Sequence, residues 1–190
     1  MKNFLVFLVL AVTPAMAGSV NHSGISGNLA ASATFFNCGV NLCISLSNIS
    51  PVDVTVPADV LTGVFWSTSG GNVTLTPESV ALISGSSVVF GGTDPGEVLG
   101  GEFAYEQGLS SPAFYGVASA GYICGICRFP GSNLQGPDGV DGLQYGIVSF
   151  ADNTATGNAP VTGDHALIKG GVLIILAGAT AEFDVGRINN

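Results

Sequence analysis

The sequence predicts an all-β fold: a single antiparallel β-sandwich or jelly-roll-like domain that follows a signal peptide. Three observations support this prediction. Short apolar runs recur along the chain, several of them with period-2 alternation. No 11-residue window carries a convincing helical stripe, and 28 glycines and nine prolines supply frequent turns. Short strands joined by tight turns at such spacing are typical of sandwiches, so about nine to twelve strands are expected.

The first seventeen residues have the pattern of a secretory signal peptide. Lys2 gives a positive start, residues 4–12 are apolar, and Ala15-Met16-Ala17 is a small-residue cleavage motif. The apolar run is shorter than the roughly 20 residues that a transmembrane helix needs, so no membrane anchor is expected in this chain. We therefore predict a signal peptide over residues 1–17, cleavage by signal peptidase between Ala17 and Gly18, and a β-domain over residues 18–190.

The charge is sparse and strongly acidic. The formal net charge is −9, and without Lys2 three basic residues face thirteen acidic ones, a net charge of −10. Nucleic acids and anionic membranes bind clustered Lys and Arg, so neither is an expected partner. The 47% hydrophobic content favours a folded domain over a disordered one.

In chain order, residues 18–28 are polar and glycine-rich, which predicts a flexible start. Residues 30–37 and 42–48 are expected to form a hairpin, because Leu42, Ile44 and Leu46 alternate with polar or small residues after a bend at 39–41. Further strands are expected over residues 60–66, 73–75, 80–83, 88–90, 102–106, 144–150, 166–169, 172–177 and 181–185.

Two of these strands carry specific expectations. Phe103 and Tyr105 alternate with Glu102 and Glu106, which predicts that the carboxylates face solvent. Residues 172–177 are apolar on both faces, which predicts a central strand. Residues 109–130 are the least regular part of the chain, and residues 153–163 are expected to form a polar loop.

The four cysteines fall in two close pairs, Cys38/Cys43 and Cys124/Cys127, and all four are candidate disulfide residues in an exported chain. Four cysteines allow three connectivities, which sequence alone does not settle. Cys38 and Cys43 flank the expected hairpin bend, so they are placed to face each other within disulfide reach. The C-x-x-C spacing of the second pair also admits a redox role, and all four thiols admit a zinc site; a structural disulfide is the favoured interpretation.

Asp138 and Asp141 lie in a glycine-rich loop and are the best metal candidates, with Ca²⁺ as the cation. Asp also favours turns through hydrogen bonds to its own backbone, so a purely structural role is the main alternative. No other cofactor is expected.

Candidate catalytic groups are few, and we predict that the protein is not an enzyme. Asp164-His165 is a possible acid–base pair, but no G-x-S-x-G nucleophile motif accompanies it. Glu102 and Glu106 would lie about 13 Å apart along a strand, beyond the separation of paired glycosidase carboxylates. Aromatic residues could form a sugar-stacking platform, although core packing is the more general role; these residues are Trp66, Tyr105 and Tyr145.

The sequence over residues 133–147, Asn-Leu-Gln-Gly-Pro-Asp-Gly-Val-Asp-Gly-Leu-Gln-Tyr-Gly-Ile, followed by Asp-Asn-Thr-Ala-Thr-Gly-Asn at 152–158, resembles the exosortase-dependent (PEP-CTERM-type) bacterial surface proteins. Similar stretches occur at 46–50, 57–65, 75–77 and 100–105, so the resemblance runs over most of residues 30–184. Family members end in a Pro-Glu-Pro-type motif, an apolar helix and a basic tail, whereas residues 186–190 read Gly-Arg-Ile-Asn-Asn and show no such tail.

The resemblance implies a non-catalytic protein exported by a Gram-negative cell, secreted or at the cell surface and associated with biofilm or extracellular polysaccharide matrix. Its implied partners are extracellular polysaccharide or other surface proteins. Two alternatives remain: a carbohydrate-binding module assisted by Ca²⁺ at Asp138 and Asp141, and a secreted hydrolase using His165 with Asp164.

Overall fold

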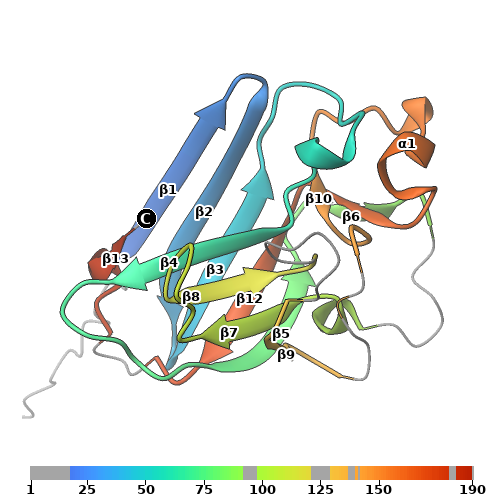
Figure 1. The fold of residues 1–190 in the computed structure, drawn as a ribbon. Coiled ribbons are helices and arrows are strands. Elements are labelled where there is room, and N and C mark those ends of the chain that lie inside the picture. The colour runs from blue at the N-terminus through green and yellow to red at the C-terminus, as the bar shows by residue number, and fades with distance from the viewer. Residues whose placement is uncertain are drawn as a thin grey trace, which may run out of the picture.

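The computed structural model describes residues 18–91, 98–120, 129–136, 140, 142–179 and 183–189. Most of its elements are strands, and two five-stranded sheets pack face to face as a β-sandwich (Figure 1). Apart from one parallel pair, the strand pairings are antiparallel, so the predicted all-β sandwich class is confirmed.

The first sheet has the order β1-β2-β3-β12-β5. Its strands are β1 (Ser19–Ser26), β2 (Leu29–Cys38), β3 (Asn41–Asn48), β12 (Gly171–Ala177) and β5 (Thr76–Leu82). The central position predicted for residues 172–177 is confirmed, because β12 pairs with β3 on one side and with β5 on the other.

The second sheet has the order β13-β4-β8-β7-β9. Its strands are β13 (Ile188–Asn189), β4 (Gly63–Thr68), β8 (Tyr115–Ala118), β7 (Ala104–Gln107) and β9 (Ser132–Asn133). A smaller sheet lies at one end and contains β10 (Ile147–Val148), β11 (Leu167–Lys169) and β6 (Ser87–Val89), with β10 and β11 parallel. The helical elements are short: the 3₁₀ turns η1 (Pro57–Asp59), η2 (Leu99–Gly101), η3 (Thr154–Thr156) and η4 (Val185–Arg187), and α1 (Ala159–Thr162).

A stack of aromatic rings joins the two large sheets. Trp66 of β4 stacks on Tyr115 of β8 and on Tyr105 of β7, with ring centroids 5.4 Å and 6.4 Å apart, and Phe35 of β2 meets it from the opposite sheet at 5.5 Å. Aromatic pairs at these separations contribute about 0.5–1.5 kcal/mol each beyond the area they bury. The stack therefore fixes how the two sheets face each other.

The predicted hairpin is confirmed, and its bend is closed as expected. Strands β2 and β3 pair from Cys38↔Asn41 outward, and Cys38 and Cys43 form a disulfide with a Cα–Cα distance of 5.9 Å. That separation lies within the normal disulfide range.

The prediction of a flexible start at residues 18–28 is wrong. Residues 19–26 form β1, which pairs with β2 along its whole length, and the turn between them uses Gly27 at φ 61°. The Asn21 side chain also donates to Ser32 Oγ and Thr34 Oγ1 across the pair, at 3.0 and 2.6 Å. A polar composition therefore suits this segment, because one face of the hairpin is exposed.

The prediction that the carboxylates of residues 102–106 share a solvent face is wrong for Glu102, which is 2% exposed. Glu102 ends the η2 turn and lies outside the strand alternation of β7. Phe103 and Tyr105 are buried in the main core, and Ala104 is buried as well because a separate apolar cluster that includes Phe129 packs on the other face of β7.

Several predicted strand limits are also wrong. Of residues 144–150 the strand β10 covers Ile147–Val148, because Tyr145 adopts φ 55° in a turn closed by the Gly146 N–H and the Leu143 carbonyl. Residues 73–75 are not a strand, and the predicted strand at 60–66 begins at Gly63 because Leu61 bridges to Ile147 instead. The loop predicted at 153–163 contains η3 and α1, and residues 181–182 lie outside the described part.

Candidate functional site: an apolar groove beside the outer hairpin

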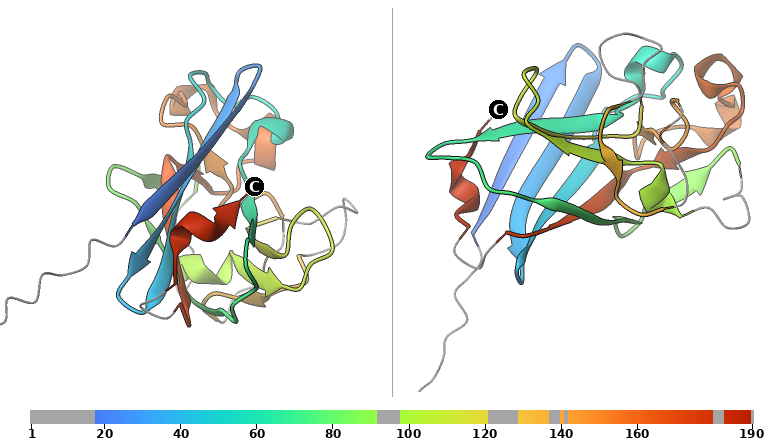
Figure 2. Two further views of the ribbon diagram at one scale, coloured as in Figure 1. Left: turned by 90° about the vertical axis from the view of Figure 1, so that its left-hand side faces the viewer. Right: turned by 60° about the horizontal axis from the view of Figure 1, so that its bottom comes forward.

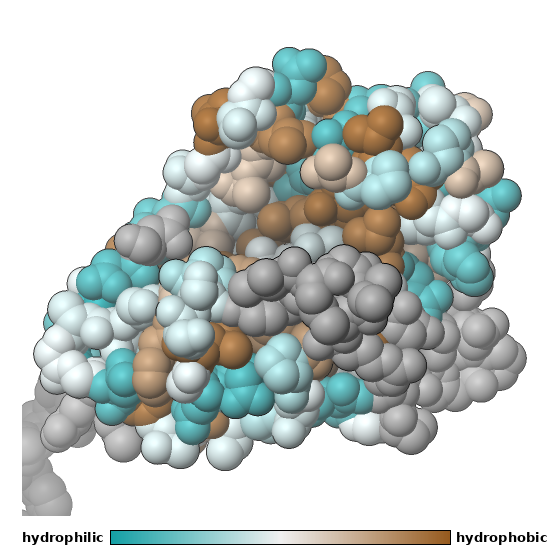
Figure 3. All heavy atoms as spheres, viewed as in Figure 1, coloured by the Kyte–Doolittle hydropathy of each residue, from teal (hydrophilic) through white to brown (hydrophobic). Residues whose placement is uncertain are grey.

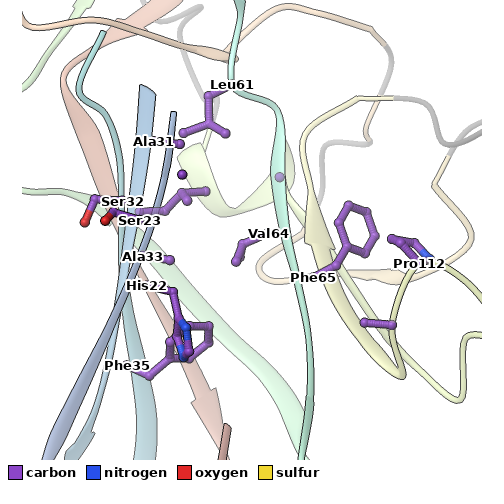
Figure 4. Close-up of a pocket in the computed structure, with 14 residues that line it drawn as sticks. His22, Ser23, Ala31, Ser32, Ala33, Phe35, Leu61, Val64, Phe65 and Pro112 are labelled. Atoms are coloured by element: carbon purple, nitrogen blue, oxygen red, sulfur yellow. The ribbon is translucent and has the colours of Figure 1, made fainter. Parts of the chain in front are cut away.

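A concave feature of the described structure lies between the inner face of the β1–β2 hairpin and β4. We call it the hairpin groove. One part of it has a volume of about 430 Å³, and its lining is predominantly apolar (Figure 4). The principal lining residues are Ala31, Ala33, Phe35, Leu61, Val64 and Phe65. A second hollow of about 430 Å³ continues it toward η1 and shares Gly24, Ala31 and Leu61 with the first.

The groove exists because the hairpin has small residues on the face toward β4, where larger side chains would fill the space between the two sheets. Gly24, Ala31 and Ala33 leave space opposite β4, whereas Phe35, further along β2, reaches the aromatic stack. The hairpin also projects past the second sheet, so no strand of the described part of the chain faces its tip (Figure 2). In the space-filling view, apolar residues gather in the hollow below the hairpin tip (Figure 3).

His22 is the main polar side chain inside the first hollow. Its ring lies edge-on to Phe35 with centroids 6.0 Å apart, and its buried Nε2 atom makes no hydrogen bond. The hydroxyls of Ser23 and Ser32 point away from the groove (Figure 4). The groove is therefore suited to an apolar chain or surface that brings one hydrogen-bonding group to His22.

The acidic residues Asp53 and Asp152 form a second site, which sequence reasoning missed. Asp152 is 3% exposed, and its Oδ1 accepts from the Val54 N–H at 3.0 Å, while its carbonyl accepts from Lys169 Nζ at 2.6 Å. Asp53 Oδ1 accepts from the Asn153 N–H at 2.9 Å. No local pattern could have revealed this pair, because its members lie about a hundred positions apart in the sequence.

The two carboxyl groups of this pair share a hydrogen bond. Burial raises the pKa of Asp152 above its ordinary value, and the bond from Asp152 lowers the pKa of Asp53. The two shifts have opposite signs because burial disfavours the ionised form of Asp152, whereas the hydrogen bond stabilises the ionised form of Asp53. Each partner also accepts a backbone N–H from the other's loop, so the pair connects the segments around residues 53–54 and 152–153.

The candidate metal residues and the second cysteine pair lie outside the described part of the chain; they are Asp138, Asp141, Cys124 and Cys127. Within the described ranges, no three His, Cys, Asp or Glu side chains gather closely enough to hold a metal ion.

The residues of the hydrolase hypothesis lie in an exposed turn. Asp164 adopts φ 70°, and the His165 carbonyl accepts from Asn158 Nδ2 at 2.7 Å and from Thr162 Oγ1 at 2.9 Å. These contacts involve the backbone of His165, so they fit the role of a polar residue preceding strand β11.

The aromatic residues considered for sugar stacking belong to the core. Trp66, Tyr105 and Tyr145 are 1%, 4% and 2% exposed. Core packing, the alternative named for them, is confirmed, and these three rings offer no exposed face to a sugar.

Comparison with family models, with curated proteins and with solved structures finds no match for this chain. In the described part of the chain, no helix combines the length and the apolar character that spanning a bilayer requires.

Proposed function

We propose that this chain is a non-catalytic exported protein of the bacterial cell surface or extracellular matrix, and that it acts by binding. The observation that carries the proposal is the export pattern of residues 1–17 together with the Cys38–Cys43 disulfide. Disulfides persist in oxidising compartments and are rare in the cytosol. The resemblance of residues 133–147 and 152–158 to exosortase-dependent surface proteins supports the same location.

The hairpin groove favours a particular kind of partner. Polysaccharides are recognised through exposed aromatic faces and polar side chains, whereas the groove is lined largely by aliphatic residues and Phe. Of the two implied partner classes, another surface protein therefore fits the groove better than extracellular polysaccharide does.

Export is tested by expressing the whole chain in a Gram-negative host and fractionating the cells. We expect the protein outside the cytoplasm, an N-terminus at Gly18, and Cys38 and Cys43 unreactive to alkylation before reduction. An Ala17→Arg variant should retain residues 1–17, because cleavage needs a small residue at that position. Wild-type protein found in the cytoplasm with residues 1–17 intact would contradict the proposal.

The partner class is tested on the purified exported protein. We expect no binding to a glycan array or to isolated matrix polysaccharide, with or without Ca²⁺. Calcium-dependent glycan binding that is lost in an Asp138→Asn, Asp141→Asn double variant would replace this proposal with the carbohydrate-binding module. Hydrolytic activity that disappears in His165→Ala would replace it with the secreted hydrolase.

A further inference from the structure

We propose that β1 is the pairing edge for a second copy of this chain, so that two molecules join through antiparallel β1 strands into one continuous sheet. Strand β1 is the outermost strand of the five-stranded sheet (Figure 1). Its neighbour β2 pairs with one of its edges over eight residues, and no described strand pairs with the other edge. An edge of this length carries a row of backbone N–H and C=O groups available to another chain.

The two edges of this sheet differ in how they are protected. At the opposite edge, β5 contains Pro77, which removes one N–H, and Glu78, which adds a charge, and its pairing with β12 has a register shift. These are the features by which edge strands avoid pairing. Strand β1 reads Ser-Val-Asn-His-Ser-Gly-Ile-Ser and contains no Pro, Lys, Arg, Asp or Glu. The sheet is therefore open to pairing at β1, which predicts a closed dimer and not a fibre.

The charge distribution selects a second copy as the partner. Two copies of a protein with a net charge of −9 repel each other wherever acidic surfaces approach. The chain contains no Asp, Glu, Lys or Arg from Gly18 to Val52, so strands β1, β2 and β3 carry no charge. Ile25 at the hairpin end is also 80% exposed. The β1 edge itself thus brings no charged side chain to the meeting of two acidic copies.

The register within the hairpin identifies the backbone groups that would pair. The turn between Ser26 and Leu29 has two residues, which makes Ser26↔Leu29 a hydrogen-bonded pair. By the alternation of antiparallel ladders, the N–H and C=O groups of Ser19, Asn21, Ser23 and Ile25 then point away from β2. A two-fold axis at His22 pairs Asn21 with Ser23 and Ser19 with Ile25 of the second copy, giving about eight hydrogen bonds.

This arrangement also brings the hairpin groove next to the second molecule. The two halves of β1 have different surroundings in each copy. The start of β1 lies beside η4, since a Cβ built on Gly18 would lie 3.8 Å from Val185. The other half, residues 22–26, lies beside the groove. Antiparallel pairing about His22 sets the groove half of one β1 beside the η4 half of the other. Pairing of the edges therefore places apolar groove residues close to a second protein surface.

The test is sedimentation equilibrium on the exported chain, with Ser23→Pro as the variant and Ala81→Lys on β5 as the matched control. We expect a wild-type dimer with a micromolar Kd, typical of a small interface. Ser23→Pro removes an outward N–H from each copy without removing a β1–β2 bond, so the Kd should rise ~30-fold. Ala81→Lys alters an exposed position on the other edge and should leave the Kd unchanged.

Amide exchange measured by NMR locates the interface independently of any variant. In concentrated wild-type protein the amides of Asn21 and Ser23 should be protected, and on dilution they should exchange quickly, whereas the His22 amide stays protected throughout. The proposal is overturned if the wild type is monomeric at ~500 µM, a concentration far above the expected Kd. It is also overturned if the dimer forms while the Asn21 and Ser23 amides exchange quickly. If Ser23→Pro fails to fold, Ser23→Lys takes its place, since it keeps the backbone and adds a repelling charge near the axis.

Discussion

Removing one buried hydroxyl should destabilise this fold measurably. Tyr115 is fully buried in the aromatic stack, and its hydroxyl accepts from the Val73 N–H at 2.7 Å and donates to the Val73 carbonyl at 2.9 Å. One side chain thereby holds both backbone groups of a residue that belongs to no strand. Tyr115→Phe keeps the ring and its stacking on Trp66 but leaves both groups of Val73 without their partner.

The expected cost follows from those two bonds. A net hydrogen bond contributes about 1 kcal/mol, and a part-buried backbone group left without a partner costs more. Val73 is partly exposed, so water compensates in part, and we expect a loss of about 2–3 kcal/mol. For a domain of this size that corresponds to a fall in Tm of about 5–10 °C.

The assay is urea unfolding followed by Trp66 fluorescence, with Tyr105→Phe as the control. Tyr105 donates to Gln107 Oε1 at 3.1 Å, and that oxygen also accepts the Leu75 N–H, so Tyr105→Phe should cost about 1 kcal/mol or less. The midpoint should fall with the m-value unchanged. If Tyr115→Phe costs no more than Tyr105→Phe, the hydroxyl does not hold the Val73 segment and the reasoning is refuted.

Three further predictions concern packing, pH and the disulfide. Gly63→Ala should lower the free energy of unfolding in urea by about 1–3 kcal/mol, because its Cβ would lie 2.6 Å from the Val117 carbonyl oxygen. Gly24→Ala is the control and should be near neutral, because nothing lies within 4 Å of its Cβ. Equal effects of the two variants would contradict this prediction. The raised pKa of Asp152 means that the folded state holds a proton that the unfolded state releases, so stability should fall as pH rises from about 4 through that pKa. Asp152→Asn removes the titrating carboxyl and should abolish this fall in thermal unfolding between pH 4 and 8; an unchanged profile would show that Asp152 does not cause it. Replacing both Cys38 and Cys43 by Ser should lower the free energy of unfolding by about 2 kcal/mol, which is the loop-entropy value for so short a loop. A loss above about 4 kcal/mol would show that the disulfide does more than restrict the unfolded chain.

Local pattern predicted the elements whose partners are close in sequence. The β2–β3 hairpin and its disulfide follow from alternation on either side of a short bend, and β12 follows from a run that is apolar on both faces. In each case the physical cause, side-chain periodicity or turn geometry, is contained within a few residues.

Pattern failed where a distant segment decided the environment. Residues 19–26 have the composition of a loop, yet pairing with β2 makes them a strand. Glu102 follows a polar alternation, yet it is buried, because it ends the η2 turn and lies outside the strand alternation of β7. Neither outcome can be read from the residues concerned.

The candidate site shows the same limit. The groove depends on small residues of one hairpin standing opposite β4, and the acidic pair depends on two loops about a hundred residues apart. The sequence shows that His22 is one of two histidines. It does not show that the His22 ring lies against Phe35 with its Nε2 buried and without a hydrogen bond.

The sequence by itself carried the signal-peptide pattern of residues 1–17 and the acidic character, and it predicted the all-β class and one hairpin, because these depend on composition and on contacts between near neighbours. The tertiary structure decided which edge of the sheet has no described neighbour, where the groove lies, and which two carboxyl groups lie together. Those features arise from the packing of segments far apart in the chain, and burial there changes the free energy of a polar group in a way that no local pattern records.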